Sequence, residues 1–231
     1  MGRGLGRALQ AAVLREGGDA DLDLEGGSLA NARRRHVFRY LCSRPCARVG
    51  DVGRELRMSQ ATVRWHAWDL VEHGYLLVEG TRVFPAGLID AEDASMFATL
   101  ALPGRAAIFS AVFANPGISF QDLAARVHLT RQSISKIGTE LVQYGLVTLA
   151  TDGRYRRLYP TDLIRRKRDA NRARANVFAE TLLHRLSAEG FTSALMRRDE
   201  TTILVRIGVG ARQVLLDVPL DPYTTAWSEP A

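Results

Sequence analysis

The stretch SQATVRWHAWDLVEHG, residues 59–74, decides the fold. Ser59 is a residue type preferred at a helix N-cap, so a helix is predicted from Gln60 to about His73. Gly74 then supplies the left-handed residue that commonly ends a helix. Three apolar residues at helical spacing form the predicted inward face of this helix: Val63, Leu70 and Val71.

The same pattern recurs 71 residues further along the chain, so that residues 37–74 align with residues 108–145. Six aligned pairs are identical: Phe38/Phe109, Pro45/Pro116, Asp51/Asp122, Leu70/Leu141, Val71/Val142 and Gly74/Gly145. Five more are conservative: Met58/Leu129, Ser59/Thr130, Thr62/Ser133, Val63/Ile134 and Asp69/Glu140. Beyond the glycines the offset becomes 75, so the second copy carries four extra residues before Tyr159. This repeat predicts one structural module that is present twice.

Each copy is predicted to contain three helices followed by a β-hairpin. The first copy has a helix that ends before Pro45, and its later elements are predicted over 49–57, 60–73, 75–78 and 82–84. In the second copy Thr130 takes the place of the N-cap and Gly145 ends the third helix. Its longer hairpin is predicted to turn at residues 151–153, because Asp-Gly is a turn signal.

Helices and a hairpin in this order are typical of a winged helix-turn-helix. Residues 59–66, with Leu70 and Gly74, resemble the recognition-helix pattern S-x-x-T-V-R-x-H-L-x-x-L-x-x-x-G of archaeal and bacterial MarR- and ArsR-like regulators. The chain departs from that pattern at Ala67, and the second copy has Ile137 where the pattern has His. The resemblance implies two winged helices that bind duplex DNA and regulate transcription.

The resemblance covers residues 34–89 and 105–164, which we expect to be winged helix 1 and winged helix 2. The remaining segments are predicted to be a flexible N-terminal segment (1–33, with a candidate short helix over 5–14), an acidic connector (90–104) and a C-terminal α+β domain (165–231). That last domain begins with a long basic helix and continues with three strands, at 192–197, 202–207 and 213–218, in an antiparallel sheet. The predicted fold class is mainly α with small β, or α+β.

The resemblance also selects the residues that would contact DNA. In a winged helix the third helix enters the major groove and the hairpin lies along the backbone. Gln can pair with adenine and Arg with guanine, whereas the cap hydroxyls lie where a helix N-terminus favours a phosphate. The candidate DNA-binding residues of the first copy are Ser59, Gln60, Ala61, Arg64, Trp65 and Arg82. Those of the second copy are Thr130, Arg131, Gln132, Ser135, Lys136, Arg154, Arg156 and Arg157, and its longer, Arg-rich wing is the better candidate contact.

The charge pattern agrees with a nucleic-acid partner. The 231 residues carry 31 Lys and Arg against 25 Asp and Glu, a net charge of +6. Residues 34–89 have nine cations against five anions and residues 105–164 have seven against four, whereas the connector has no cation. The densest basic run follows the second wing and consists of Arg165, Arg166, Lys167 and Arg168. Cations are disfavoured at a helix N-terminus, so this run favours an anionic partner and an extended DNA footprint; the alternative is a solvated helix start.

The sequence carries no nucleophile motif, Gly-rich phosphate loop or His-Glu metal helix, so we expect no enzyme, no cofactor and no metal. Cys42 and Cys46 cannot build a disulfide framework, and Cys42 lies on the inward stripe of its helix. His66 matches the inward histidine of the family pattern and is expected to be structural. The N-terminus is too charged for a secretory signal, and the longest uncharged stretch, 106–121, is broken by Asn-Pro-Gly. A cytoplasmic, nucleoid-associated protein is therefore expected.

Other functions stay open at this point. Trp65 and Trp68 share one helix face and favour a protein partner or a homodimer through that face, or packing on the neighbouring module. Tandem winged helices also resemble scaffold subunits of chromosome-segregation, polymerase-associated and membrane-sorting complexes, and a general chromatin or replication-initiator protein is a further alternative. A mixed arrangement would place the second copy on DNA and the first on a partner. The C-terminal domain is a candidate for dimerisation or partner binding.

Overall fold

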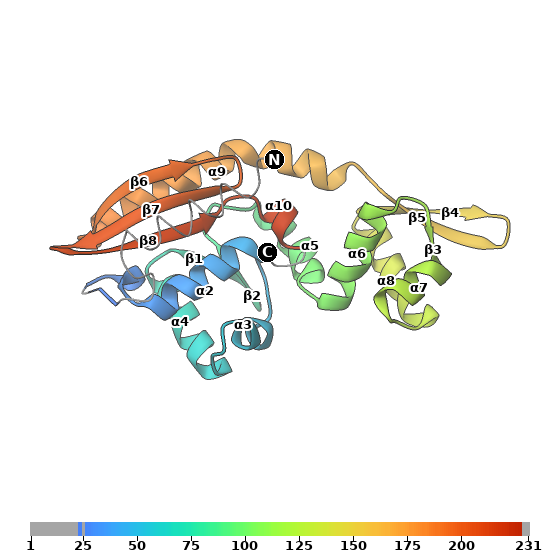
Figure 1. Ribbon diagram of the computed structural model, residues 1–231, viewed down its shortest axis with the longest axis horizontal. Coiled ribbons are helices and arrows are strands. Elements are labelled where there is room, and N and C mark those ends of the chain that lie inside the picture. The colour runs from blue at the N-terminus through green and yellow to red at the C-terminus, as the bar shows by residue number, and fades with distance from the viewer. Residues whose placement is uncertain (1–22, 25, 228–231) are drawn as a thin grey trace, which may run out of the picture.

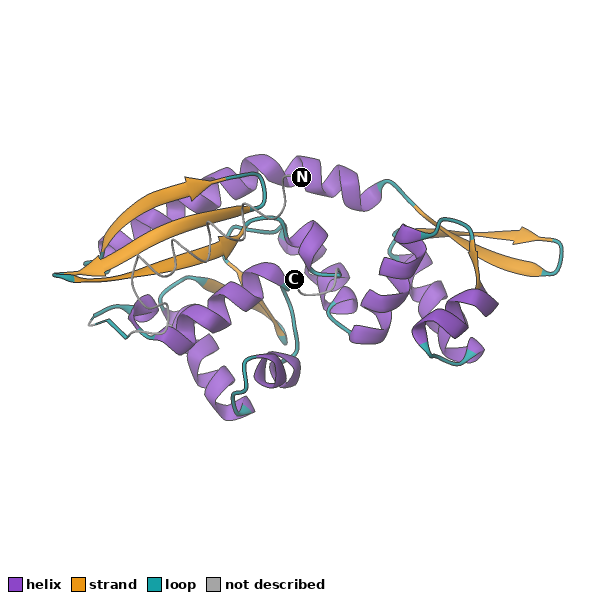
Figure 2. Cartoon of the chain, in the orientation of Figure 1, coloured by secondary structure: helices purple, strands orange, loops and turns teal. Residues whose placement is uncertain are grey.

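The chain forms two units that each join helices to a β-hairpin, and a long helix with a three-stranded sheet follows them (Figure 1). The structure is a computed structural model, which describes residues 23–24 and 26–227. Over these residues helices predominate and the sheets are small and antiparallel (Figure 2), which confirms the predicted α+β fold class. The short helix predicted over 5–14 lies outside the described residues.

The first unit (residues 32–85) contains three helices and a short hairpin. Its elements are α2 (Ala32–Ser43), α3 (Val49–Glu55), α4 (Gln60–Glu72), β1 (Leu76–Glu79) and β2 (Arg82–Pro85). α4 begins at the predicted residue because the Ser59 hydroxyl accepts a hydrogen bond from the Thr62 N–H at 3.0 Å. It ends before Gly74, whose φ of +74° is the left-handed conformation expected there.

The second unit (residues 103–160) repeats this order with a longer hairpin. Its elements are α6 (Pro103–Ala114), β3 (Ile118–Ser119), α7 (Phe120–Val127), α8 (Arg131–Gln143), β4 (Val147–Asp152) and β5 (Tyr155–Pro160). The predicted N-cap of α8 is confirmed, since the Thr130 hydroxyl accepts a hydrogen bond from the Ser133 N–H at 3.1 Å. The sequence did not predict β3, a two-residue strand that pairs with β5.

The two units share backbone details that their residue types do not reveal. Left-handed φ values occur at equivalent positions, 71 residues apart: Cys46/Gly117, Arg57/His128 and Gly74/Gly145. In the first unit the Cys46 N–H donates to the Val83 carbonyl at 2.9 Å, and in the second unit the Gly117 N–H donates to the Leu158 carbonyl at 2.8 Å. Both units therefore fasten the loop after their first helix to the second hairpin strand, and β3 extends this contact.

The four extra residues of the second copy lengthen its hairpin by two residues on each strand. β1 pairs with β2 from Leu76↔Pro85 to Glu79↔Arg82, and β4 pairs with β5 from Val147↔Pro160 to Asp152↔Tyr155. Both hairpins turn through two residues, of which the first is a glycine with positive φ, Gly80 or Gly153. The longer hairpin projects from the end of the molecule that the second unit forms (Figure 1).

The segment between the two units is helical and contributes to the core. It contains the 3-10 turn η2 (Ala91–Asp93) and α5 (Ala94–Leu100), whose buried residues are Ala94, Met96, Phe97 and Leu100. The sequence predicted an acidic connector over 90–104, to which no helix was assigned. The acidic residues occupy the start of the segment, and the apolar residues that follow them are the ones that pack.

The C-terminal part consists of α9 (Leu163–Ala188), the strands β6 (Thr192–Arg198), β7 (Thr202–Val209) and β8 (Arg212–Pro219), and α10 (Pro222–Thr225). The sheet order β6-β7-β8 is the antiparallel arrangement predicted for this part. The C-terminal part is also joined to the first unit, because Phe38 of α2 stacks on Phe178 of α9 at 6.4 Å and Arg39 of α2 pairs with Asp217 of β8 at 3.1 Å.

Polar groups of α9 bind the segment after the first hairpin. The Asn171 amide donates to the Leu88 carbonyl at 2.9 Å, and Arg174 pairs with Asp90 at 2.7 Å. The buried Asp93 carboxylate accepts hydrogen bonds from the Lys167 ammonium and, at 2.6 Å, from the Tyr223 hydroxyl. Three segments that are distant in sequence therefore meet at Asp93.

No single helix within residues 23–24 and 26–227 is long and apolar enough to cross a membrane. One bent pair, Ala91–Leu100 with Pro103–Ala114, meets the length and composition criteria together, with an angle of 93° between its two parts.

Candidate nucleic-acid interface

The N-termini of α4 and α8 are built in the same way. Ser59 and Thr130 cap the two helices, and each hydroxyl also lies within 2.9 Å of a second hydroxyl, that of Thr62 or Ser133. Both caps are exposed. Each helix therefore begins at the surface, where its first N–H groups and the positive end of its dipole face outward and can receive an anion.

The outward face of α8 is polar and basic. Arg131, Gln132 and Lys136 are exposed, and Ser135 is half-buried beside the hairpin. The inward face holds Ile134, Gly138 and Leu141. The division between these faces matches the expected placement of the four candidate residues on one outward surface.

The three arginines of the β4–β5 hairpin have different surroundings. Arg154 lies in the turn, where its guanidinium stacks over the Tyr155 ring at 5.2 Å and donates to the Tyr155 hydroxyl at 3.1 Å. Arg156 lies over the Phe120 ring at 4.7 Å, and its guanidinium is 3.4 Å from the Ser135 hydroxyl of α8. Both side chains remain exposed, so aromatic stacking restrains them without neutralising their charge.

Arg157 has a different role from its two neighbours. Its guanidinium pairs with Asp152 at 2.9 Å and donates to the Gly117 carbonyl at 2.9 Å, so it fastens the hairpin to the loop after α6. Adjacent residues of a strand point to opposite faces. Arg156 therefore points towards α8, and Arg157 positions the hairpin from its other face.

The outward face of α4 is aromatic as well as polar. Gln60, Ala61 and Arg64 are exposed, and Trp65 and Trp68 expose 60% and 61% of their surface. Arg34 of α2 stacks over Trp65 at 5.3 Å and pairs with Asp69 at 2.5 Å, and the Trp68 indole N–H donates to Glu72 at 2.9 Å. The face thus differs from that of α8, which carries no tryptophan.

The shorter hairpin carries less free charge. Arg82 is half-buried, and its guanidinium lies 4.0 Å from Glu79 across the turn. This contact partly neutralises the one arginine that was predicted to act as the DNA contact of this hairpin.

His66 is buried in the first unit, as expected, but one of its ring nitrogens is unsatisfied. The side chain is 3% exposed, and Nδ1 has no hydrogen-bond partner among the described residues. Burial lowers the pKa of His66, and the guanidinium charges of Arg34 and Arg33 lower it further. The neutral imidazole is therefore favoured.

The basic run at the start of α9 is largely paired within the chain. Lys167 pairs with Asp93, Arg168 with Asp221 at 2.8 Å, and Arg166 with Asp162 at 3.2 Å. The sequence predicted an anionic partner for this run, and the chain supplies carboxylates of its own. Arg165 is exposed and has no ion pair among the described residues.

The two thiols are free and buried, and within the described residues there is no cluster of three or more His, Cys, Asp or Glu side chains. Burial raises the pKa of both thiols, that of Cys46 to about 12. Two cations that were not predicted as site residues, Arg33 and Arg57, line a pocket beside α4. The run Arg33-Arg34-Arg35 was a visible signal for the first, although Arg35 itself is buried and donates to the carbonyls of residues 29 and 30.

No family model matches the chain, and no curated protein matches it. Solved structures match parts of it. The PcaV transcriptional regulator from Streptomyces coelicolor, in complex with its natural ligand, is 26% identical over 36% of this chain and 61% of that chain, with a TM-score of 0.28. The multiple antibiotic-resistance repressor (MarR) from Listeria monocytogenes 4b F2365 is 26% identical over 39% of this chain and 63% of that chain, with a TM-score of 0.26.

ScpB from Mycobacterium tuberculosis is 17% identical over 56% of this chain and 91% of that chain, with a TM-score of 0.22. The chain thus spans about three fifths of the length of the two regulators. These TM-scores are all below 0.3, so the geometry of the chain itself carries the functional argument.

Proposed function

We propose that this protein is a duplex-DNA-binding transcriptional regulator whose two units are tandem winged helices. The recognition helices α4 and α8 would lie in the major groove, and the β4–β5 hairpin would lie on the backbone or in the minor groove. The observation that carries the proposal is that the longer hairpin brings an exposed arginine to the basic helix α8 of the second unit. The Ser135 and Phe120 contacts hold Arg156 beside this helix, whose outward face also carries the exposed Arg131 and Lys136.

The chemistry of this surface suits DNA. The exposed N-terminus of α8 can receive a backbone phosphate, and Gln132 offers the amide that pairs with adenine. Arg154 projects from the turn of the longer hairpin, where an arginine can reach a phosphate or the minor groove. Lys167 and Arg168 are left out of the proposed interface because buried carboxylates hold them.

The proposal is tested by fluorescence anisotropy with a labelled mixed-sequence duplex, between about 50 and 200 mM salt. The wild-type chain is compared with Arg154→Ala/Arg156→Ala. Each phosphate contact that is lost should reduce the slope of log affinity against log salt by about 0.9, so the double variant should lose up to about two units. The matched control is Arg206→Ala/Arg212→Ala, which removes two exposed charges from the C-terminal sheet.

Two results would refute this assignment. One is a wild-type chain that does not bind the duplex at the lowest salt. The other is an equal loss of slope in the control variant, which would show that only the net charge matters. Arg157→Ala is a useful third variant: because Arg157 fastens the hairpin, we expect it to weaken binding by loosening the position of Arg154 and Arg156.

A second candidate function is favoured by the two tryptophans of α4, which expose 60% and 61% of their surface. In this arrangement the second unit binds DNA and the first unit binds a protein through Trp65 and Trp68. Trp65→Ser/Trp68→Ser distinguishes the two cases. A direct DNA role for α4 requires weaker duplex binding by this variant, whereas a protein-binding role leaves duplex binding unchanged.

A further inference from the structure

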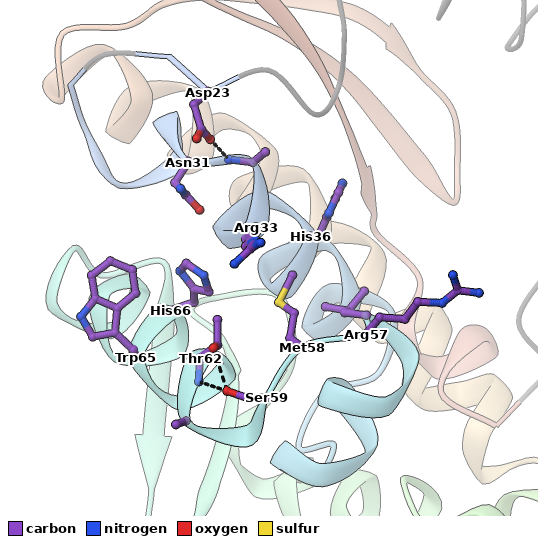
Figure 3. A pocket seen from close by; sticks show the side chains of 13 residues that line it. Asp23, Asn31, Arg33, His36, Arg57, Met58, Ser59, Thr62, Trp65 and His66 are labelled. Carbon is purple, nitrogen blue, oxygen red and sulfur yellow. Dashed lines mark hydrogen bonds between the residues drawn. The ribbon is translucent and has the colours of Figure 1, made fainter.

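A pocket with a volume of about 950 Å³ opens between α2, the turn before α4 and the first turns of α4 (Figure 3). Arg33 projects from α2 into the middle of this space, and Arg57 stands at its rim. Met58 and Trp65 supply apolar wall. The pocket is large enough for a small organic molecule or a segment of a polymer backbone.

The charge of the pocket is positive and largely uncompensated. The guanidinium groups of Arg33 and Arg57 have no ion pair or hydrogen bond within the described part of the chain, and both side chains are exposed. Among the described lining residues the one carboxylate is that of Asp23, which accepts a hydrogen bond from the Ala32 N–H at 2.6 Å. Arg33 in the middle of the space and Arg57 at its rim offer guanidinium groups, which are suited to the oxygens of an anion.

A buried group in the wall also lacks a partner. His66 is 3% exposed and lines the pocket, and its Nδ1 has no hydrogen-bond partner among the described residues. The Trp65 ring packs edge-on against the His66 ring at 4.9 Å and is itself mostly exposed. An unpaired polar atom in such a wall is satisfied when a ligand occupies the space.

The N-terminus of α4 adds a third feature. Ser59, Ala61 and Thr62 line the pocket, and α4 is a helix of 13 residues, so the positive end of its dipole lies at this wall. Ser59, Ala61 and Trp65 also belong to the candidate DNA-binding residues of the first unit. The pocket and the outward face of α4 are therefore parts of one surface.

We propose that this pocket binds a phosphate group that is carried on an organic residue. Arg33 and Arg57 contact its oxygens, the N-terminus of α4 faces its charge, and the apolar wall accommodates the attached residue. Such a phosphate has two sources: the backbone of a bound DNA duplex, or a free phosphate ester. The first source rests on the function proposed above, and the second does not.

The first experiment tests whether the pocket binds a free phosphate group, with inorganic phosphate as the probe. The melting temperature of the chain is followed against phosphate concentration, with chloride at matched ionic strength as the reference. A phosphate concentration ten times the Kd should raise the melting temperature by roughly 3–6 °C. The variant Arg33→Gln/Arg57→Gln should lose this rise, and Arg206→Gln/Arg212→Gln should keep it.

The second experiment tests whether a phosphate of the DNA backbone occupies the pocket, by measuring duplex affinity against salt for the same two variants. Loss of two phosphate contacts should reduce the slope of log affinity against log salt by up to about two units in Arg33→Gln/Arg57→Gln, and the control should keep the wild-type slope. A reduced slope without a phosphate-induced rise assigns the site to the DNA backbone. A phosphate-induced rise without a change in slope assigns it to a free phosphate ester.

The proposal is overturned if Arg33→Gln/Arg57→Gln behaves like the wild type in both experiments, or if the control variant loses as much. Its failure is distinct from failure of the proposed function. A wild-type chain that binds DNA, with the slope and the phosphate-induced rise both unchanged in the pocket variant, refutes the pocket alone. A chain that binds no duplex but loses its phosphate-induced rise in the pocket variant refutes the DNA function and keeps the pocket.

Discussion

Replacing Asp93 by Ala should destabilise the chain more than any exposed ion pair does. The carboxylate is buried and accepts hydrogen bonds from the Lys167 ammonium and the Tyr223 hydroxyl, the latter at 2.6 Å. A hydrogen bond to a charged group contributes about 1.5–3 kcal/mol. The Lys167 contact is discounted because that side chain is about one third exposed. We therefore expect a loss of about 3 kcal/mol in the free energy of unfolding, measured by urea titration with circular dichroism.

The matched control is Asp90→Asn. The Asp90 carboxylate lies in the same segment as Asp93 and pairs with Arg174 of α9 at 2.7 Å, but both side chains are more than 40% exposed, so the expected loss is below about 1 kcal/mol. Asparagine keeps the oxygen that accepts a hydrogen bond from the Glu92 N–H, so the substitution removes the ion pair alone. Tyr223→Phe removes the hydroxyl alone and should account for about half of the Asp93 effect. Equal losses for Asp93→Ala and Asp90→Asn would refute the expectation, because burial would then make no difference.

Three further outcomes follow from local geometry. Ser59→Ala and Thr130→Ala should each lower the free energy of unfolding by about 1 kcal/mol, because each removes the acceptor of an N-cap hydrogen bond; a null effect in urea titrations would contradict this. Cys42 and Cys46 should react slowly with iodoacetamide at pH 8 and rapidly in urea, because burial raises the pKa of both thiols; fast labelling of the folded chain would show that they are accessible. Burial and two neighbouring arginines lower the pKa of His66 in the folded chain, so the unfolded chain binds this proton more tightly. The contribution of His66 to the free energy of unfolding should therefore be complete above about pH 6.5, and it should decrease as the pH falls towards the pKa of His66 in the folded chain. An unchanged pH profile in His66→Gln would count against this.

The sequence predicted the elements of both units because their signals are local. The cap hydroxyls, the terminal glycines and the helical spacing of apolar residues act within one or two turns, and the structure places both caps where they were expected. The change of offset from 71 to 75 also located the four extra residues in the second hairpin. Repetition made these local signals easier to recognise, since each one occurred twice.

Local sequence signals do not predict the parts of the structure that depend on distant contacts. The basic run of α9 looked available, but Lys167 and Arg168 find their carboxylates 74 and 53 residues away, at Asp93 and Asp221. The helix α5 was not predicted, because the segment was interpreted from the acidic residues at its start. Ala94, Phe97 and Leu100 nevertheless follow a helical spacing that indicates the helix. The strand β3 is too short to carry a pattern of its own.

The rod-like helix α9 follows the second hairpin with only Thr161 and Asp162 between them. Its 26 residues span about 39 Å, and its bonds to Leu88 and Asp90 hold it against the segment that follows the first hairpin. A two-residue link therefore joins the second unit to a helix that is bonded beside the first unit. For a protein that binds one duplex through both units, this makes the helical phase of the DNA a condition of binding. Two target sequences moved apart by five base pairs would face opposite sides of a helix with about 10.5 base pairs per turn. Binding would then depend on the distance between the two target sequences as well as on their identity.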